Sequence, residues 1–493
     1  MRFCNNPEFF LLHSMKFSAL KLAILLLVLP FLVASCSEDN LLKKIPGDAD
    51  LVVFVDFKKI AFQSLDLSML FSGSTSSDKK NGEWKDSGID FLGRAVLFSR
   101  SPKDESRLYY LMIPLSDSDQ FRQFCRSQGG FREGAEGNEV WLEKGRIRIH
   151  LKEKEAMVII SKNQEESDLY QSEATALQSL REEDNLLSAS EKFAALCGEN
   201  KATGIWMRSL ESLASDYSLY LPPAYLQAEL TGSADFPAGE LLMEAELSTA
   251  DSASSPSILG EPINPNLTSS CLNQINASGL AAFSLSMPGL RSALKLSGFD
   301  ESASLMASAY GISLQEITDV FSGQVAMATG KTEPGSIPPV RVLLGLKTSP
   351  ALLLQKLGTA GLLLEKGKGE YAPADFPYIS IIREEDYLSI QYGAFTEGSP
   401  EESLLEFSGS GSGQFMLSLN LSDLPGNIEK VENSAIIKDW KTIRFLLSKK
   451  EERKTSITCR LVCSNEKESS LAVLLRSLKP LAGKADKNQA VVF

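Results

Sequence analysis

Hydrophobic and polar residues alternate along much of the chain. In VWLEKGRIRIHLKEKEAMVIIS (Val140–Ser161), three alternating runs are separated by Lys144-Gly145 and by the charged segment 152–155. A period of two places successive side chains on opposite faces of a strand, so each run has one apolar and one polar face. We therefore predict a meander of three antiparallel strands that is covered on one face.

Helical patterns lie between the predicted strands. The segments QFRQFCRS (Gln120–Ser127) and ALLLQKLG (Ala351–Gly358) carry apolar residues at helical spacing. Ser313 is followed three residues later by Glu316, a pair that can cap the first turn of a helix, which predicts a helix start near Ser313. The predicted fold class is α+β, with antiparallel, hairpin-rich sheets and packed helices rather than a doubly wound parallel sheet.

This order of patterns occurs twice. Phe91 and Gly93 in IDFLGRAVLFS match Phe321 and Gly323 in TDVFSGQVAMAT, at an offset of roughly 230 residues. Three further pairs of segments match at nearly the same offset: Asp48–Ile60 with Asn276–Leu290, Arg107–Phe121 with Arg341–Leu353, and Arg146–Ser161 with Tyr378–Tyr392. The constant offset predicts a tandem duplication of a unit of roughly 230 residues.

The chain divides into five predicted parts: residues 1–35 as a signal peptide, 36–47 as a lipidated tether, 48–250 as the first repeat, 251–271 as a linker and 272–493 as the second repeat. The linker region is rich in Ser, Ala and Pro, a composition that buries little apolar area. Asp251-Ser252-Ala253 resembles the short O-glycosylation motif of exported Bacteroidetes proteins. Ser252 is therefore a candidate glycosylation site, and an unmodified linker is the alternative.

The N-terminal residues have the pattern of a secretory signal. Lys16 and Lys21 precede an uncharged run, Leu22–Leu32, which is shorter than the roughly 20 apolar residues that span a bilayer. A charged start, a short apolar run and small residues at its end are typical of a signal peptide. In this pattern Met15 is a more natural start than Met1.

Small residues and a cysteine end the apolar run. The sequence Val33–Cys36 resembles the bacterial lipobox. This resemblance implies cleavage between Ser35 and Cys36 and lipidation of Cys36, which would become the new N-terminus. A diacylglyceryl group with an added N-acyl chain exceeds the two anchoring signals that stable membrane attachment requires.

Acidic residues follow this cysteine at once. Ser37, Glu38 and Asp39 resemble the surface-export signal of Bacteroidetes-type lipoproteins, and a solvated tether is the alternative. The lipobox, the segment KKIPGDADLVVFVDFKKI (Lys43–Ile60) and the two halves together resemble an uncharacterised family of Bacteroidetes lipoproteins known only as a domain of unknown function. This resemblance implies a location in the cell envelope, anchored to the outer membrane and exposed at the surface, and it brings no catalytic residues.

The charge balance narrows the choice of partners. The chain has 63 Asp and Glu against 50 Lys and Arg, a formal net charge of −13. An acidic surface repels phosphate backbones and anionic headgroups. We therefore expect no nucleic acid partner, and we expect membrane contact through the lipid anchor alone.

The histidine content excludes several kinds of site. His13 lies in the predicted signal, which leaves His150, a predicted strand-surface residue whose partner in the second half is Ile382. Sites that need several histidines, including the H-E-x-x-H helix, are therefore excluded within one chain. The stretch GQVAMATGKT has Val325 where a phosphate-binding loop needs Gly. The pattern S-x-x-K recurs as often as chance allows in a Ser-rich chain, and no cofactor or metal is predicted.

The cysteines beyond Cys36 do not form a disulfide framework by number or spacing. They are Cys125, Cys197, Cys271, Cys459 and Cys463. The last two lie in SITCRLVCS, where period-two alternation places both on one strand face. They are interpreted as small buried hydrophobic residues, and a metal pair is the alternative.

Carboxylates are the remaining candidates for catalysis. Two acids at a suitable separation are sufficient for glycoside hydrolysis. Glu153 and Glu155 lie at one predicted turn, and Glu384, Glu385 and Asp386 lie at another. Because charge at hairpin turns is normally solvated, we expect these acids to be exposed, and we predict no catalytic residues.

One segment could form an aromatic contact loop. In DYSLYLPPAYLQ, Tyr217, Tyr220 and Tyr225 surround a Pro-Pro pair, and a packed turn is the alternative. The resulting hypothesis is a lipid-anchored envelope protein with a binding or structural role and an unknown protein or glycan partner. The alternatives are an envelope hydrolase that uses paired carboxylates, for example on glycans, and an accessory lipoprotein of an outer-membrane complex.

Overall fold

The computed structural model describes most of the chain between residues 41 and 474. The described residues are 41–63, 87–101, 107–136, 139–161, 167–199, 201–211, 214, 223–249, 259–273, 275–296, 299–331, 338–393, 404, 407, 413–421, 439–451 and 453–474. They form two compact units. Unit 1 comprises Met1–Ser209, Glu229–Met243 and Asn465–Phe493, and unit 2 comprises Leu210–Ala228 and Glu244–Ser464.

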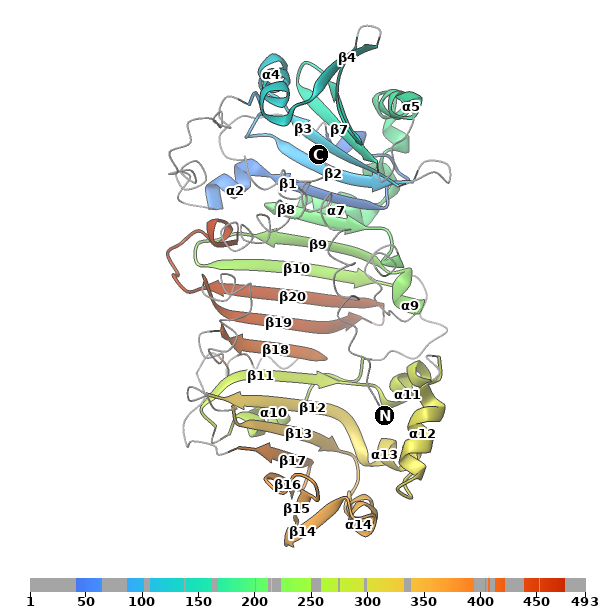
Figure 1. Ribbon diagram of the computed structural model, residues 1–493, viewed down its shortest axis with the longest axis vertical. Helices are drawn as coiled ribbons and strands as arrows, with labels where there is room; N and C mark the ends of the chain where they lie inside the picture. Colours follow the sequence, from blue (N-terminus) through green and yellow to red (C-terminus); the bar gives the residue numbers. More distant parts are fainter. Residues whose placement is uncertain are drawn as a thin grey trace. The chain divides into compact units, whose positions relative to one another are not determined.

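Unit 1 contains an antiparallel sheet with helices inserted between its strands (Figure 1). Its strands are β1 (Leu51–Asp56), β2 (Arg94–Arg100), β3 (Leu108–Pro114), β4 (Arg132–Glu136), β5 (Glu139–Lys144), β6 (Ile147–Leu151), β7 (Glu155–Ser161), β8 (Thr203–Met207) and β9 (Glu229–Asp235). Its helices are η3 (Leu42–Lys44), α2 (Phe57–Gln63), α4 (Ser118–Gly129), α5 (Ser167–Gln178), η6 (Glu182–Asp184), α6 (Leu186–Ala189) and α7 (Glu191–Gly198). Strand β10 (Glu240–Ser248) begins in unit 1 and ends in unit 2.

Unit 2 has the same kinds of elements. Its strands are β11 (Ala277–Ser284), β12 (Phe321–Gly330), β13 (Val340–Leu346), β14 (Leu363–Gly367), β15 (Glu370–Pro373), β16 (Ile379–Arg383), β17 (Tyr387–Tyr392), β18 (Phe415–Asn420), β19 (Trp440–Glu451) and β20 (Lys454–Cys463). Its helices are α9 (Pro223–Leu226), α10 (Pro265–Leu272), α11 (Met287–Leu296), α12 (Phe299–Ser308), α13 (Leu314–Val320) and α14 (Ala351–Thr359).

The strands pair in the same order in both units. In unit 1 the antiparallel order is β4-β5-β6-β7-β3-β2-β1-β8-β9. In unit 2 it is β14-β15-β16-β17-β13-β12-β11-β18-β19-β20. The predicted combination of helices with hairpin-rich antiparallel sheets is therefore confirmed.

Two local predictions agree with the structure. The alternating runs of Val140–Ser161 form β5, β6 and β7, and Gly145 takes a positive φ of 57° in the first turn. Ser313 caps α13, with a reciprocal capping box between the Ser313 and Glu316 side chains and backbone N–H groups. Both features depend on neighbouring residues only, which is why the sequence pattern predicts them.

One face of the unit 1 sheet is covered by the helices between β7 and β8. Phe54, Phe98 and Tyr110 project from three adjacent strands into a core that also contains residues of α5, α6 and α7. The rings of Phe98 and Tyr110 stack at a centroid distance of 4.7 Å. Because alternate strand residues share a face, this core takes every second residue of each strand.

In unit 2 the matching layer is α10, which contacts β11, β12 and β13 (Figure 1). Residues 265–271 fall in the C-terminal part of the predicted linker, yet they belong to this helix, with Leu267 and Cys271 buried against Leu280 of β11. The helix forms because Asn264 caps it and its apolar residues lie on one side, which a composition count over the whole linker does not register. Residues 251–258 lie outside the described part.

Candidate functional site

Most of the predicted site residues fall in parts of the chain that are not described. These are Ser35, Cys36, Ser37, Glu38, Asp39, Tyr217, Tyr220 and Ser252. Tyr225 is described, and it lies in α9 as a half-buried residue. The residues that the structure does bring together begin within the predicted tether, at Leu42, and continue past its end.

The predicted tether is wrong at its C-terminal end, because residues 42–47 are built into the core of unit 1 together with residues 48 and 49. Leu42, Ile45 and Ala49 are 2%, 0% and 0% exposed. The backbone N–H of Leu186 donates to the Ile45 carbonyl oxygen at 2.8 Å, and that of Gly47 donates to the Asp184 carbonyl oxygen at 2.8 Å. Residues 42–49 are therefore fixed both by apolar burial and by backbone hydrogen bonds to the helical layer.

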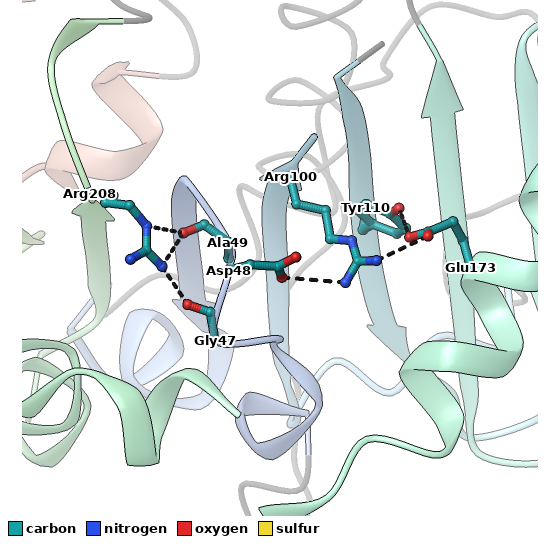
Figure 2. A network of polar contacts seen from close by, with 7 residues as sticks. All are labelled: Gly47, Asp48, Ala49, Arg100, Tyr110, Glu173 and Arg208. Atoms are coloured by element: carbon teal, nitrogen blue, oxygen red, sulfur yellow. Dashed lines mark hydrogen bonds and ion pairs between the residues drawn. The ribbon is translucent and has the colours of Figure 1, made fainter. Parts of the chain in front are cut away.

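Arg208 holds the same segment from the end of β8. Its guanidinium donates to the carbonyl oxygen of Gly47, and its Nε and Nη2 atoms each lie 3.1 Å from the carbonyl oxygen of Ala49 (Figure 2). The guanidinium carbon also lies 5.5 Å from the centre of the Trp206 ring, within range of a cation–π contact. One arginine thus satisfies two carbonyl groups that no sheet ladder would otherwise pair.

A second arginine joins this segment to α5. Arg100 Nη1 lies 3.3 Å from Asp48 Oδ1, and Arg100 Nη2 lies 3.0 Å from Glu173 Oε1 (Figure 2). The Tyr110 hydroxyl donates to the other Glu173 oxygen. The Glu173 side chain is only 7% exposed, whereas that of Asp48 is 62% exposed, so the network runs from solvent into the core.

The electrostatics of this network follow from its burial. Burial raises the pKa of the Tyr110 phenol, and the hydrogen bond to Glu173 raises it further. Burial opposes the charge of Arg100, but the carboxylates of Glu173 and Asp48 more than compensate, so its pKa rises. The network therefore consists of a permanent cation, its two carboxylates and a neutral phenol donor.

This arrangement suits a structural connection better than proton transfer. Both oxygens of Glu173 are engaged, one by Arg100 and one by Tyr110. A general base needs an oxygen that can reach a substrate proton. The four side chains instead tie the segment around Asp48 to β2, β3 and α5.

The carboxylates considered for catalysis do not converge in the described structure. Glu153, Glu384, Glu385 and Asp386 are exposed, as predicted. The prediction is wrong for Glu155, whose side chain is 20% exposed because it forms an ion pair with Lys44 of η3. Glu155 therefore holds the same N-terminal segment that Arg208 and Arg100 hold, through its ion pair with Lys44.

The prediction that His150 lies on the strand surface is wrong. The residue is 2% exposed, its ring centre lies 4.8 Å from that of Trp141, and its Nδ1 lies 3.3 Å from Gln178 Nε2. Alternation within the strand places His150 on one face, but α5 covers that face, which only the tertiary packing decides.

The cysteines fit the interpretation as small apolar residues. Cys463 is buried and Cys459 is half-buried on β20. Four residues of extended strand separate the two Cα atoms by about 13 Å, too far for both thiolates to bind one metal at about 2.3 Å. Among all residues that the structure describes, no group of three or more His, Cys, Asp or Glu could hold a metal ion.

Sequence reasoning missed the acid at the centre of the network. Glu173 lies on the apolar side of α5, between Tyr170 and Leu177 at helical spacing. An acid inside an apolar stripe is the available signal, because a buried carboxylate requires partners. The pattern could not name those partners, Arg100 and Tyr110, which lie far away in the chain.

In the described parts of the chain, no helix combines the length and the apolar character needed to cross a membrane. No protein-family model matches the chain. No curated protein matches it either.

Solved structures give a weak similarity. Crystal form I of TP0453 has 12% sequence identity and a TM-score of 0.27, and the match covers 44% of this chain and 79% of that one. Crystal form III of the same protein has 12% identity, a TM-score of 0.30, and coverage of 46% and 84%. Crystal form IV has 13% identity, a TM-score of 0.29, and coverage of 42% and 79%. Scores this low carry no argument about the fold or the function of this chain.

Proposed function

We propose that this protein is a lipid-anchored lipoprotein of the cell envelope with a binding or structural role, attached to the outer membrane through Cys36 and exposed at the cell surface. The observation that carries the proposal is the lipobox Val33–Cys36, which is followed within a few residues by a segment built into the core of unit 1. An anchor joined to a fixed segment would hold a folded unit at the membrane.

The short stretch of chain between Cys36 and the buried segment supports the proposal that the lipid holds unit 1 at the membrane. Six residue steps separate Cys36 from Leu42. A fully extended chain of that length spans roughly 20 Å. Arg208, Arg100 and Lys44 fix residues 44–49 on the folded side, so the lipid and unit 1 would be separated by little free chain.

We further propose that the two units descend from a tandem duplication of roughly 230 residues. The matching sequence blocks support this, as does the identical strand order in the two units. A duplicated unit behind a single anchor is suited to presenting two related surfaces to a protein or glycan partner.

The lipid anchor is tested by metabolic labelling with an alkyne fatty acid in the native host. The wild-type chain should take up the label, and Cys36→Ala should not. Cys459→Ala, which removes a cysteine from a strand, serves as the matched control and should label like the wild type. Equal labelling of Cys36→Ala and wild type would contradict the proposal.

Surface exposure requires a separate measurement. Intact cells are treated with an added protease, and the fraction of the protein cleaved is compared between wild type and a variant with Glu38→Lys and Asp39→Lys. The variant should keep its fatty-acid label and lose accessibility to the protease. A wild-type protein that is fully protected in intact cells would place the anchor on the periplasmic side instead.

A further inference from the structure

The sheet of unit 2 has two faces that are buried to different degrees. Leu280 and Ala282 of β11, Ala326 of β12 and Leu343 of β13 point toward α10 and are 0–1% exposed. On the opposite face, directly paired residues form one row across six strands. The row is Ile381, Ile390, Val342, Met327, Ala281 and Leu417. We call this side of the sheet the open face.

Every residue of this row is apolar, yet none is fully buried. Met327, at the centre, is 39% exposed, and the other five are half-buried. The adjoining rows on β11, β12, β13, β17 and β18 also lack a charged side chain, and at one end of them Leu388 is 4% exposed because it packs against Leu354 of α14. Such an apolar area in a chain of net charge −13 marks an interaction surface.

The centre of the corresponding row in unit 1 is more deeply buried, although Val53 in that row is half-buried. Leu97 of β2 pairs with Val53 of β1 and Leu111 of β3, as Met327 of β12 pairs with Ala281 of β11 and Val342 of β13. Leu97 is only 2% exposed and Leu111 only 4%. The same position in the same strand order is therefore buried in one unit and open in the other.

We propose that the open face of unit 2 packs against the open face of a second copy of this chain, forming a two-fold symmetric dimer. Two sheets with apolar faces pack at a separation of about 10 Å, and a two-fold axis brings identical patches together. A second copy of the chain would cover the apolar face that lies on the side of the sheet opposite α10.

Size supports a macromolecular partner. Seven strands from β16 to β19, about 4.8 Å apart, with three same-face residues each, span roughly 34 by 20 Å. Two such faces would bury about 1,400 Å², within the range of about 1,200–2,000 Å² for stable protein interfaces.

Charge supports a second copy in particular. Two chains of net charge −13 repel each other over most of their surfaces. On β11, β12, β13, β17 and β18 the rows around Met327 carry no charged side chain, so two copies can approach there without placing like charges against each other, and Arg383 of β16 lies at the margin of the face. Phe415 and Phe445, whose ring centres lie 5.5 Å apart on this face, add aromatic area to the contact.

The test measures mass in solution. The chain from residue 37 onward, which includes both units and lacks the lipid, is examined by sedimentation velocity and light scattering at micromolar concentrations. Wild type should have twice the monomer mass. Met327→Glu should raise the dissociation constant at least about tenfold, because it would bury a charge in the contact. Ile390→Lys, on neighbouring β17, gives an independent second variant.

The matched control changes an apolar residue outside the open face. Leu305 of α12 is 73% exposed, and Leu305→Glu should leave the dimer intact. Circular dichroism melts should show all variants folded, since Met327 is already exposed in the monomer. A monomeric wild type, or a dimer lost in Leu305→Glu and kept in Met327→Glu, would overturn the proposal. A monomer that carries a co-purified lipid in native mass spectrometry would assign the face to an acyl ligand and would also overturn it.

Discussion

Removal of the Glu173 side chain should lower the local stability of unit 1 around Arg100 and Tyr110. The change Glu173→Ala leaves the buried Tyr110 hydroxyl without its acceptor and deprives Arg100 of one of its two carboxylates. Breaking a buried ion pair by removing one partner typically costs about 3–5 kcal/mol. Because Arg100 retains Asp48, we expect the lower end of this range, about 3 kcal/mol of local stability.

Hydrogen–deuterium exchange with mass spectrometry measures this loss directly. Peptides from β3 (Leu108–Pro114) report the opening of the network, and peptides from β13 (Val340–Leu346) serve as an internal reference in unit 2. A loss of about 3 kcal/mol corresponds to roughly 100-fold faster exchange, since each factor of ten is about 1.4 kcal/mol. The β13 peptides should exchange at the wild-type rate.

Tyr110→Phe separates the network from general packing. This variant keeps the ring that stacks on Phe98 and loses only the hydroxyl. Alone it should cost about 1.5 kcal/mol, the value for a hydrogen bond to a charged group. Combined with Glu173→Ala it should add almost nothing, because the hydroxyl then has no acceptor to lose. Strictly additive losses in the double variant would refute a shared network, as would β3 exchange that Glu173→Ala leaves unchanged.

The contact between Tyr110 and Glu173 also predicts that the stability of unit 1 falls at high pH. The folded protein raises the pKa of Tyr110, whereas the phenol of an unfolded chain ionises near about 10. The stabilisation is therefore complete below about pH 10 and declines as the pH rises above it, because only the unfolded chain releases the proton. The opening free energy of β3 should fall more steeply above about pH 10 in wild type than in Tyr110→Phe, and equal slopes would contradict this assignment.

Three further predictions concern single positions. Burial raises the pKa of the Cys271 thiol to about 12, so its alkylation by iodoacetamide at pH 8 should be slow in the folded protein and become fast in denaturant, as followed by peptide mass spectrometry. Gly204→Ala would place a Cβ atom 2.3 Å from the Phe54 ring, and the overpacking should lower the free energy of unfolding by about 1–3 kcal/mol in urea titrations. Gly239→Ala combines a φ of 79° with a Cβ position 2.4 Å from a backbone oxygen of segment 465–474, so this segment should become more sensitive to limited proteolysis.

Local features of this protein could be predicted from the sequence because neighbouring residues produce them. The alternation in Val140–Ser161 predicted β5 to β7, and the pair Ser313 and Glu316 predicted the start of α13. A strand pattern needs only a period of two, and a capping box needs only residues three positions apart. The helices α4 and α14 follow from apolar spacing in the same way.

Tertiary packing decided which face of each strand is buried and which is exposed. The pattern of β6 placed His150 on one side of a strand, but only the presence of α5 made that side interior. Met327 and Leu97 have equivalent places in equivalent strand orders, yet one is exposed and the other is buried. Alternation defines two faces of a strand, and it cannot say which of them a distant segment covers.

The network around Glu173 shows the same limit most clearly. Asp48 and Arg100 are 52 residues apart, and Arg100 and Glu173 are 73 residues apart. By itself, the sequence determined local elements such as β5 to β7 and the start of α13, and the lipobox stays a prediction. Only the tertiary structure brought a cation, two carboxylates and a phenol into contact, because a charge buried in the core is stable only where distant segments supply its partners.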